Sequence, residues 1–413
     1  MPGAEQASAT LAWTLLLLSA AAVLGLAILL GGLARVFARA PRLAVLSKSD
    51  EQAPPPEGSL TVVVPAYNEA ANIGPCLSGL LASEPPCSRW RVLLVDDGSS
   101  DDTLVIGRQA AAQALAEAAA PAESFGVLDA GPRPAGERWV GKTWPCSRAM
   151  EQVDSDWVLF LDADVRLQPV ALRRALAQAV AEGADLLSLA PRLSCGCLAE
   201  WMVQPLMLSL LGLGFPIEAA NDPASPVAFA AGPFMLFRRS AYEAIGGHRA
   251  VAGEVVEDLA LARRIKESGH SLRYLLGLDA ADLRMYADFP ALWEGWTKNW
   301  LLGLDGNVPA ALGAAAVVAL MFSAPWLLAP AAAIAALLLP AERGPLLTAL
   351  ALAVLGIGLQ LALRLWMQRQ FALPLRHWWL MGAGGLVVAA IGPTSVWRTR
   401  TGRGWTWKGR PLE

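Results

Sequence analysis

The chain has 413 residues, of which 55% are apolar and only 17% are charged, and its formal net charge is −3. So small a charged fraction indicates that part of the chain lies in lipid. The negative balance argues against a nucleic-acid partner, because nucleic-acid-binding domains carry basic patches. The length allows one large domain with additional elements.

Apolar residues are concentrated towards the two ends of the chain. Residues 11–33 carry no charge and are long enough to cross a hydrocarbon core of roughly 30 Å, which predicts a transmembrane anchor over 9–33. A cleaved signal peptide is the alternative, but its apolar core usually spans only ~7–15 residues and follows a basic segment. Uncharged stretches within 308–397 predict three or four further transmembrane segments.

The positions of the basic residues predict how the chain is oriented. No Lys or Arg precedes the anchor, and the first ones to follow it are Arg35, Arg39 and Arg42. The positive-inside rule then places the N-terminus outside and the next domain in the cytoplasm, against the inner membrane.

The basic tail 398–413 is expected on the cytoplasmic side as well, which requires an even number of later spans. Four spans fit if 308–340 forms two short crossings. Three arginines would then lie outside, against the same rule: Arg364, Arg369 and Arg376. Three spans, or one re-entrant segment, are the alternatives that stay open.

The charged middle of the chain, 59–286, follows a Pro-rich linker at 48–58 and is predicted to be a cytoplasmic domain. Strand and helix patterns alternate along it. Strands are predicted at 60–65, 91–95, 125–128, 156–161 and 185–189, and helices at 69–81, 102–120, 142–153 and 170–182. This alternation predicts an α/β fold with a mostly parallel sheet covered on both faces. Ligands of such sheets bind beyond the carboxyl ends of the strands.

The most informative feature is a pair of carboxylates, Asp162 and Asp164, at the end of the apolar strand 157–161. Side chains at i and i+2 of a strand point the same way, so these two repel each other unless a cation lies beside them. A divalent cation with oxygen ligands fits this arrangement and commonly joins protein carboxylates to substrate phosphates.

Three further polar clusters fall at predicted strand or helix ends. The first strand ends in Pro65-Ala66-Tyr67-Asn68-Glu69, the second ends in Asp96-Asp97-Gly98-Ser99-Ser100, and Glu257-Asp258 opens a helix. Each cluster alone is also explained as a turn or a helix cap. Their shared placement at strand ends favours a common site.

Together these motifs resemble the family 2 glycosyltransferases, which have the GT-A fold. The matching strings are Val62-Val-Val-Pro-Ala-Tyr-Asn-Glu69, Leu94-Val-Asp-Asp-Gly-Ser-Ser100, Phe160-Leu-Asp-Ala-Asp-Val165 and Val256-Glu-Asp-Leu259. The resemblance covers about 60–286 and implies a Rossmann-like nucleotide-diphospho-sugar transferase domain between N- and C-terminal transmembrane helices.

The resemblance also implies roles for individual residues. It places nucleotide-sugar binding at Pro65, Ala66, Tyr67, Glu69, Asp96, Asp97, Lys142 and Asp162. Asp164, with Asp162, is expected to hold Mg²⁺ or Mn²⁺ beside the diphosphate. Asp258 is expected to be the general base, with Glu257 as its neighbour. The acceptor is expected near Gly232, Pro233 and Phe234.

The segment 287–304 is predicted to be an amphipathic helix on the membrane surface, because its large apolar residues recur at helical spacing and include Trp293 and Trp296 near the acceptor. A helix packed into a protein core is the alternative. Five cysteines are an odd number, and a cytoplasmic location would keep them reduced.

Two short strings, Gly141-Lys-Thr-Trp144 and Glu294-Gly-Trp-Thr-Lys-Asn299, are similar to those of hopanoid-associated and carotenoid-type glycosyltransferases. The Gln-x-x-Arg-Trp motif of processive synthases is absent from the sequence. We therefore expect transfer of one sugar, with inversion, from a UDP-sugar to the hydroxyl of a lipid such as a hopanoid or carotenoid. A processive polysaccharide synthase and a non-catalytic membrane scaffold are the alternatives.

Overall fold

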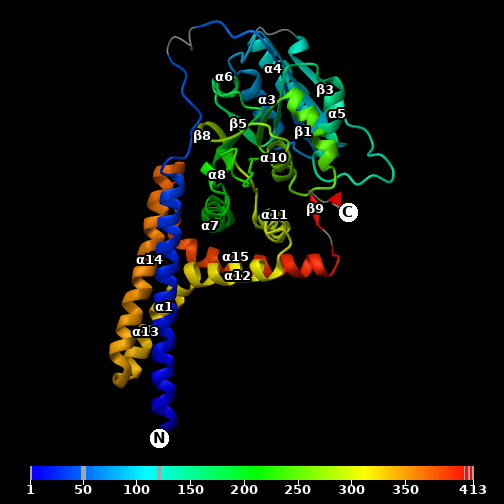
Figure 1. Ribbon diagram of the computed structural model, residues 1–413. Helices are drawn as coiled ribbons and strands as arrows, with labels where there is room; N and C mark the ends of the chain where they lie inside the picture. The colour runs from blue at the N-terminus through cyan, green and yellow to red at the C-terminus, as the bar shows by residue number, and fades with distance from the viewer. Residues whose placement is uncertain (1, 48–52, 119–121, 404, 408–409, 412–413) are drawn as a thin grey trace. The chain divides into compact units, whose positions relative to one another are not determined.

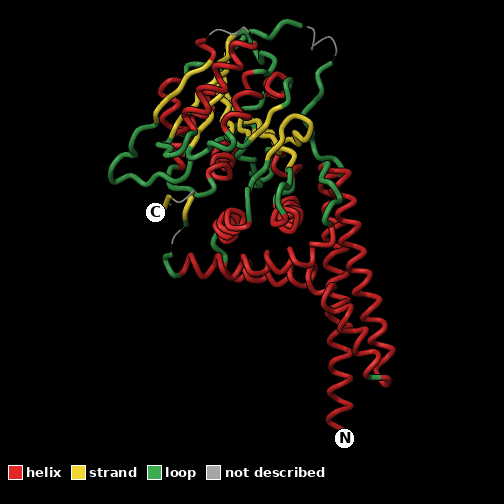
Figure 2. The backbone as a smooth tube through the Cα atoms, turned by 180° about the vertical axis from the view of Figure 1, so that it is seen from behind, coloured by secondary structure: helices red, strands yellow, loops and turns green. Residues whose placement is uncertain are grey.

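The computed structural model describes residues 2–47, 53–118, 122–403, 405–407 and 410–411, so residues 48–52 of the predicted linker lie outside the described residues. The chain divides into two compact units. An α/β unit contains Arg39–Ser194, Phe215–Met285 and Gly404–Glu413, and a helical unit contains Met1–Ala38, Cys195–Gly214 and Tyr286–Arg403. Figures 1 and 2 show the two units from opposite sides.

The α/β unit is built on an eight-stranded sheet in the order β3-β2-β1-β4-β7-β6-β8-β5. Its strands are β1 (Ser59–Ala66), β2 (Arg89–Asp96), β3 (Phe125–Asp129), β4 (Trp157–Leu161), β5 (Val165–Leu167), β6 (Leu186–Leu193), β7 (Phe234–Arg238) and β8 (Leu272–Leu283). Strands β3, β2, β1 and β4 run parallel to one another, as do β6 and β8, whereas β7 and β5 run antiparallel to their neighbours.

Side chains of β1 alternate between two apolar cores because successive residues of a strand point to opposite faces of the sheet. Val62 and Val64 belong to one core and Val63 to the other. A strand buried on both faces needs apolar residues throughout, which explains the continuous apolar run of β1.

Helices cover both faces of this sheet. The first core packs under α3 (Ile73–Leu81), α4 (Thr103–Glu117) and α6 (Ala171–Ala181), and the second under α5 (Thr143–Ala149), α9 (Arg239–Ala244) and α10 (Glu257–Glu267). The remaining elements of the unit are η1 (Ala122–Ser124), η2 (Met150–Gln152), α8 (Ile217–Asn221), η3 (Gly247–Val251) and a two-stranded sheet of β9 (Thr406–Trp407) and β10 (Arg410–Pro411).

Within the described residues, the helical unit contains four helices that are long and apolar enough to cross a membrane: Glu5–Phe37, Val308–Leu338, Pro340–Phe371 and Trp378–Arg400. Its elements are α1 (Pro2–Phe37), α7 (Leu198–Gly214), α11 (Phe289–Leu302), α12 (Val308–Val318), the π-helical turn η4 (Ala319–Ser323), α13 (Ala324–Leu338), η5 (Pro340–Glu342), α14 (Arg343–Phe371), η6 (Trp378–Leu380) and α15 (Met381–Arg400). Together with the mostly parallel sheet, these apolar helices confirm the predicted fold class.

Within the helical unit the apolar helices lie in two directions. Helices α1, α13 and α14 run side by side, whereas α12 packs along α15 and this pair lies across the other three (Figures 1 and 2). The stretch 308–338 is therefore one helical run that bends at η4, rather than two short crossings. Gln360 of α14 donates to the carbonyls of Met321 and Phe322 in η4, at 2.9 and 3.0 Å. These bonds satisfy carbonyl groups that a bend leaves without regular helical partners.

Helix α7 is a further difference from the sequence prediction. The predicted domain 59–286 is continuous, but Cys195–Gly214 packs in the helical unit. Its apolar helix is too short to cross a membrane and contacts α15 closely: a Cβ at Gly384 would lie 2.0 Å from the carbonyl oxygen of Met202. Helix α11 covers most of the predicted 287–304 and buries Trp296, whose indole N–H donates to Gln204 of α7 at 2.9 Å.

Candidate active site

The ends of β1 and β2 lie side by side, because Ala66 pairs with Asp96 in the parallel register. Asn68, with φ of 51°, turns the chain directly after β1, and its N–H donates to Ser99 Oγ at 3.0 Å. The side-chain oxygen of Asn68 in turn accepts from the N–H of Ser100 at 2.9 Å. These bonds join the first and second sequence clusters into one rigid double loop at the carboxyl edge of the sheet.

Asp96 is the acidic group at the centre of this double loop. Its Oδ2 accepts from the N–H groups of Gly98 and Ser99, at 3.2 and 3.1 Å. Its other oxygen, Oδ1, is buried and has no hydrogen-bond partner among the described residues. A buried carboxylate oxygen without a donor is costly, so this atom is a candidate acceptor for a ligand N–H group.

Asp97 lies beside Asp96 but is held by two arginines. Its Oδ2 accepts from Arg133 at 2.7 Å and from Arg410 at 2.6 Å, and Arg410 also donates to its carbonyl oxygen at 2.8 Å. Burial raises the pKa of Asp97, and the two guanidinium groups oppose that effect. The Arg410 guanidinium also lies 3.8 Å from the centroid of the Tyr67 ring, a cation–π contact.

Lys142 links the third and fourth clusters. Its ammonium forms ion pairs with Asp162 and, at 3.4 Å, with Glu257, and it donates to the carbonyl of Gly232 at 3.3 Å. Burial by itself would lower the pKa of Lys142, but the Asp162 and Glu257 carboxylates outweigh it and the pKa is raised. Lys142 therefore stays charged and holds the two acidic motifs together.

Asp258 lies in the first turn of α10, against the Gly232 segment. Its Oδ2 accepts from the N–H of Gly232 at 2.9 Å, and Oδ1 from the N–H of Leu259 at 2.8 Å. A Cβ at Gly232 would lie 2.8 Å from that Oδ2, so the backbone approaches the carboxylate more closely than a side chain would permit. Burial raises the pKa of Asp258 to about 7, with Glu257 adding to the increase and Lys142 opposing it. A carboxyl group with such a pKa can accept a proton near neutral pH.

Asp164 is the second buried carboxylate with an oxygen that lacks a partner. Burial is the main reason that the pKa of Asp164 is raised to about 7, and the negative charges of Asp162 and Glu69 add to the increase. Its Oδ1 accepts no hydrogen bond from the part of the chain that the structure describes. In that same part, no group of three or more His, Cys, Asp or Glu side chains could hold a metal ion alone. Two carboxylates nonetheless suit Mg²⁺ or Mn²⁺, which usually complete their coordination with substrate phosphates and water.

Other predicted site residues lie at different distances from this cluster. Pro65 and Ala66 end β1 beside it, and the Pro233 carbonyl accepts from the N–H of Asp162 at 3.1 Å. The Phe234 side chain is fully buried in the core of the sheet. Trp293 and Trp296 belong to α11 in the helical unit.

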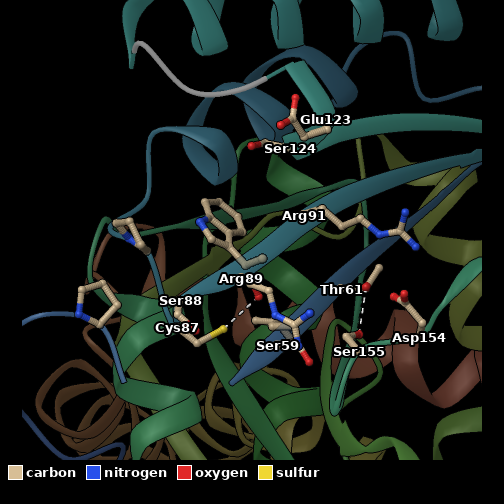
Figure 3. A pocket seen from close by; sticks show the side chains of 14 residues that line it. Ser59, Thr61, Cys87, Ser88, Arg89, Arg91, Glu123, Ser124, Asp154 and Ser155 are labelled. Carbon is tan, nitrogen blue, oxygen red and sulfur yellow. Dashed lines mark hydrogen bonds between the residues drawn. The ribbon is translucent and has the colours of Figure 1, made fainter. Parts of the chain in front are cut away.

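A cavity of about 880 Å³ lies at the other end of the sheet (Figure 3). Its lining includes Ser59 and Arg89, the first residues of β1 and β2, whereas the acidic cluster follows the last residues of these strands. The Ser155 hydroxyl donates to Thr61 in its wall at 2.9 Å. Its position at the amino ends of parallel strands argues against a role in the predicted chemistry.

Sequence reasoning missed two residues of the cluster, Arg133 and Arg410. Arg133 lies in a long loop after β3 without a motif of its own. Arg410 lies 313 positions after Asp97, in a tail whose basic residues predict only the orientation of the chain in the membrane. Because a buried carboxylate usually has a basic partner, the basic tail could have been expected to contribute one. The sequence alone does not say which arginine it is.

The fold and the cluster define the class of this unit. It is an α/β domain that gathers carboxylates and a lysine at the carboxyl edge of a parallel sheet, where such domains bind nucleotides and related ligands. Residues 61–246 match the family model described as Glycosyl transferase family 2. This part of the chain is a family 2 glycosyltransferase domain, and the resemblance inferred from its motifs is confirmed.

Relatives and solved structures give further similarities. The 4,4'-diaponeurosporenoate glycosyltransferase of Staphylococcus aureus (strain MRSA252) is 27% identical over 259 residues, which are 62% of this chain and 64% of that protein. The protein of the same name from strain USA300 is 26% identical over 254 residues, or 61% of this chain and 63% of that protein. The match thus spans less than two thirds of these relatives.

Among solved structures, mannosyltransferase PcManGT from Pyrobaculum calidifontis, in complex with GDP-Man and Mn²⁺, aligns over 91% of this chain and 99% of its own, with 19% identity and a TM-score of 0.46. Glucosyl-3-phosphoglycerate synthase from Mycobacterium tuberculosis, in complex with Mn²⁺, UDP and glucosyl-3-phosphoglycerate, aligns over 59% of this chain and 77% of its own, with 17% identity and a TM-score of 0.36.

Proposed function

We propose that this protein is an inverting glycosyltransferase that moves one sugar from a UDP-sugar to a lipid in the membrane. The observation that carries the proposal is the gathering of Asp162, Asp164, Glu257 and Asp258 around Lys142 in a family 2 glycosyltransferase domain. The end of β2, which carries Asp96, is joined to this group by Arg133, which donates to Asp97 and to the Gly141 carbonyl. Asp96 and Asp164 each have a buried oxygen that accepts no hydrogen bond from the described residues, and Asp258 has a pKa suited to proton transfer.

The nucleotide would bind at the end of β2. Uracil carries an N–H group, and Asp96 Oδ1 is a buried acceptor that lacks a donor among the residues described. The Tyr67 ring lies on the neighbouring loop and already has one cation against it. Arg410 and Arg133 hold Asp97, so the loop that carries Asp96 is fixed before the nucleotide arrives.

The diphosphate would bind beside Asp162 and Asp164. These residues would hold Mg²⁺ or Mn²⁺, which neutralises the charge that develops on the departing UDP. Lys142 keeps Asp162 oriented and adds a fixed positive charge at the same place. Asp162 is paired with Lys142, whereas Asp164 has an oxygen that accepts no hydrogen bond from the residues described.

Asp258 would act as the base for an acceptor hydroxyl. A hydroxyl is a weak nucleophile and must lose its proton to a group within hydrogen-bond reach. A single carboxylate base suits one displacement with inversion at the sugar. The S. aureus relatives are named for an acid anion, 4,4'-diaponeurosporenoate. A carboxylate oxygen attacks without losing a proton, so the effect of Asp258→Asn separates the two acceptor chemistries.

The helical unit supports a location in the inner membrane with the transferase domain in the cytoplasm. We propose that only α1, α13 and α14 cross the bilayer, and that α12 and α15 lie along its inner face. The pair α12–α15 packs across the other three helices and leaves Leu312, Val317, Leu386 and Trp397 exposed. Exposed apolar side chains of this size suit the interfacial region of a bilayer.

This topology agrees with the charges. With the N-terminus outside the cell, α1 crosses the membrane to the cytoplasm, where the transferase domain follows. Helix α13 then crosses to the outside, and α14 returns to the cytoplasm. Arg369 and Arg376 then lie inside, as the positive-inside rule requires. The tail also ends inside, which suits the contact of Arg410 with Asp97 in the α/β unit. Three full crossings after the domain would place that tail on the opposite side.

The test is transfer by the full-length protein in lipid nanodiscs, with a panel of labelled UDP-hexoses and extracted bacterial lipids. We expect an organic-soluble product that carries one hexose and requires Mg²⁺ or Mn²⁺. Asp164→Ala and Asp258→Asn should each lower transfer to a hydroxyl acceptor by at least about 100-fold. Glu117→Gln, an exposed carboxylate on α4, is the control and should not change it. An insoluble polymer would instead identify a processive synthase, and failure to bind any UDP-sugar would overturn the proposal.

A further inference from the structure

The helical unit contains one arginine that is completely buried. Arg364 lies on α14, about two turns before the end of the helix, and none of its surface is exposed. Its guanidinium lies 5.9 Å from the Trp201 ring of α7, and its helix neighbours Leu363 and Met367 are buried as well. A permanent positive charge is thus buried beside an aromatic ring, and the Cys195 thiol lies close enough to interact with it electrostatically.

Only one of the three guanidinium nitrogens is satisfied. Nη2 donates to the carbonyl of Pro374 at 2.7 Å and, more weakly, to that of Arg376 at 3.4 Å. Nε and Nη1 are buried and have no acceptor among the described residues. Among the described residues, no Asp or Glu forms an ion pair with Arg364, whose hydrogen-bond acceptors are backbone carbonyls.

The buried acid of this unit does not neutralise Arg364. Glu200 of α7 accepts from the N–H of Gly196 at 2.8 Å and from the N–H of Tyr286 at 3.0 Å, one with each oxygen. Arginine does not give up its proton in proteins, so it cannot become neutral to escape the cost of burial. A buried positive charge with two donors that lack acceptors among the described residues suits an anion with oxygen acceptors.

We propose that Arg364 binds the anionic group of the lipid acceptor, a carboxylate or a phosphate. This inference rests on the proposed function, because it specifies the acceptor of the same transfer reaction. Arg364 lies in an apolar helix that is long enough to cross a membrane, a setting that suits a long hydrocarbon chain with an acidic end better than a soluble anion. Charged residues within membrane helices usually mark the binding site of a substrate or ion.

A purely structural role is the competing explanation. In that case Arg364 only fixes the segment that follows α14, through the carbonyls of Pro374 and Arg376. Such a clamp uses Nη2 and leaves Nε and Nη1 without any purpose. The two explanations differ in one measurable property, because a clamp gives the protein no preference for acidic lipids over neutral ones.

The experiment measures binding of parinaric acid, a fluorescent polyene fatty acid, and of its methyl ester to the full-length protein in phosphatidylcholine nanodiscs. The acid should bind more tightly than the ester by a factor on the order of 10 to 100, the usual effect of hydrogen bonds to a charged group. Arg364→Gln should reduce that ratio to about 1, because a neutral amide has no preference for the anion. Arg369→Gln, an exposed arginine of the same helix, should leave the ratio unchanged.

Two further measurements keep the outcome interpretable. UDP-sugar binding to the wild type tests the proposed function separately, and UDP-sugar binding to Arg364→Gln shows that this variant is folded. If Arg364→Gln does not fold, the test rests on the wild-type protein alone. Equal affinities of the wild type for parinaric acid and its methyl ester would then overturn the inference. The same two affinities are also measured in nanodiscs that contain phosphatidylglycerol, an anionic phospholipid. Loss of the acid preference there means that bulk anionic phospholipid occupies Arg364, which also overturns the assignment to the acceptor.

Discussion

Replacing Gly232 by alanine tests how closely Asp258 must be positioned for catalysis. The N–H of Gly232 donates to Asp258 Oδ2 at 2.9 Å. An added Cβ would lie only 2.8 Å from that oxygen, whereas ordinary van der Waals contacts begin at 3.4 Å. The carboxylate must therefore retreat by about 0.6 Å, the difference between these two distances, unless the backbone moves instead.

The expected result is a lower kcat with little change in donor binding. A displacement of 1 Å at a reacting group costs about 100-fold in rate, so a shift of this size should reduce kcat by about 10-fold or somewhat more. Gly232 does not have a positive φ, so alanine introduces no backbone strain and the fold should be retained. The carbonyl of Gly232 still faces Lys142, so the donor side of the cluster is preserved.

The assay is steady-state transfer in nanodiscs, with UDP-sugar affinity measured separately by calorimetry. Gly253→Ala is the matched control, because its nearest neighbour would lie 3.9 Å from the new Cβ and the contact is ordinary. That variant should keep wild-type kcat. If Gly232→Ala also kept it, with the fold and donor affinity unchanged, the reasoning that the position of Asp258 limits the reaction would be refuted.

The remaining predictions concern proton transfer, the tail and the membrane. Burial, and after it Glu257, raises the pKa of Asp258 to about 7, so this base is protonated at lower pH. The value of kcat/KM for a hydroxyl acceptor should therefore rise about tenfold per pH unit up to pH 7 and then level off. A flat profile between pH 5 and 8 would exclude Asp258 as the base. Arg410→Ala leaves Asp97 with one cation and should weaken UDP binding about 3- to 10-fold in calorimetry, whereas tighter binding would mean that Arg410 obstructs the nucleotide. In a cysteine-free background, Ala341→Cys should react with an impermeant reagent on intact cells and Arg369→Cys should not, and the reverse pattern would contradict the proposed topology.

The carboxyl edge of the sheet was largely predictable from sequence because its geometry is local. Once β1, β2 and β4 are recognised as parallel, their ends must meet at one edge, so Asp96 and Asp162 are expected to lie near each other. The predicted strands agree with the observed ones to within one or two residues at most ends, except that β6 runs on to Leu193. The role of Lys142 as the link between Asp162 and Glu257 needed the structure, because these residues are brought together only by packing.

The arrangement of the apolar helices was not predictable in the same way. Mean hydropathy records whether a segment prefers lipid but not in which direction it runs. The bend at η4 depends on Gln360, which lies some forty residues later and supplies the hydrogen bonds for Met321 and Phe322. The contact between α12 and α15 depends on Gly392, where a Cβ would lie 2.7 Å from Ala315. Neither feature has a signature in the local sequence.

The charges of the cluster explain why protons and divalent cations should compete at the site. Five carboxyl groups gather here, and Lys142 forms ion pairs with Asp162 and Glu257 among the residues that the structure describes. The other three belong to Glu69, Asp164 and Asp258. Burial, and after it the negative charges of Asp162 and Glu69, raise the pKa of Asp164 to about 7. Binding of a divalent cation at Asp164 must then release a proton near neutral pH, so cation affinity should increase with pH up to that value. A UDP-sugar adds two negative charges, which would oppose the same carboxylates unless the cation enters with it. The donor and the cation are therefore expected to bind together, with Lys142 holding the acidic motifs in place until they do.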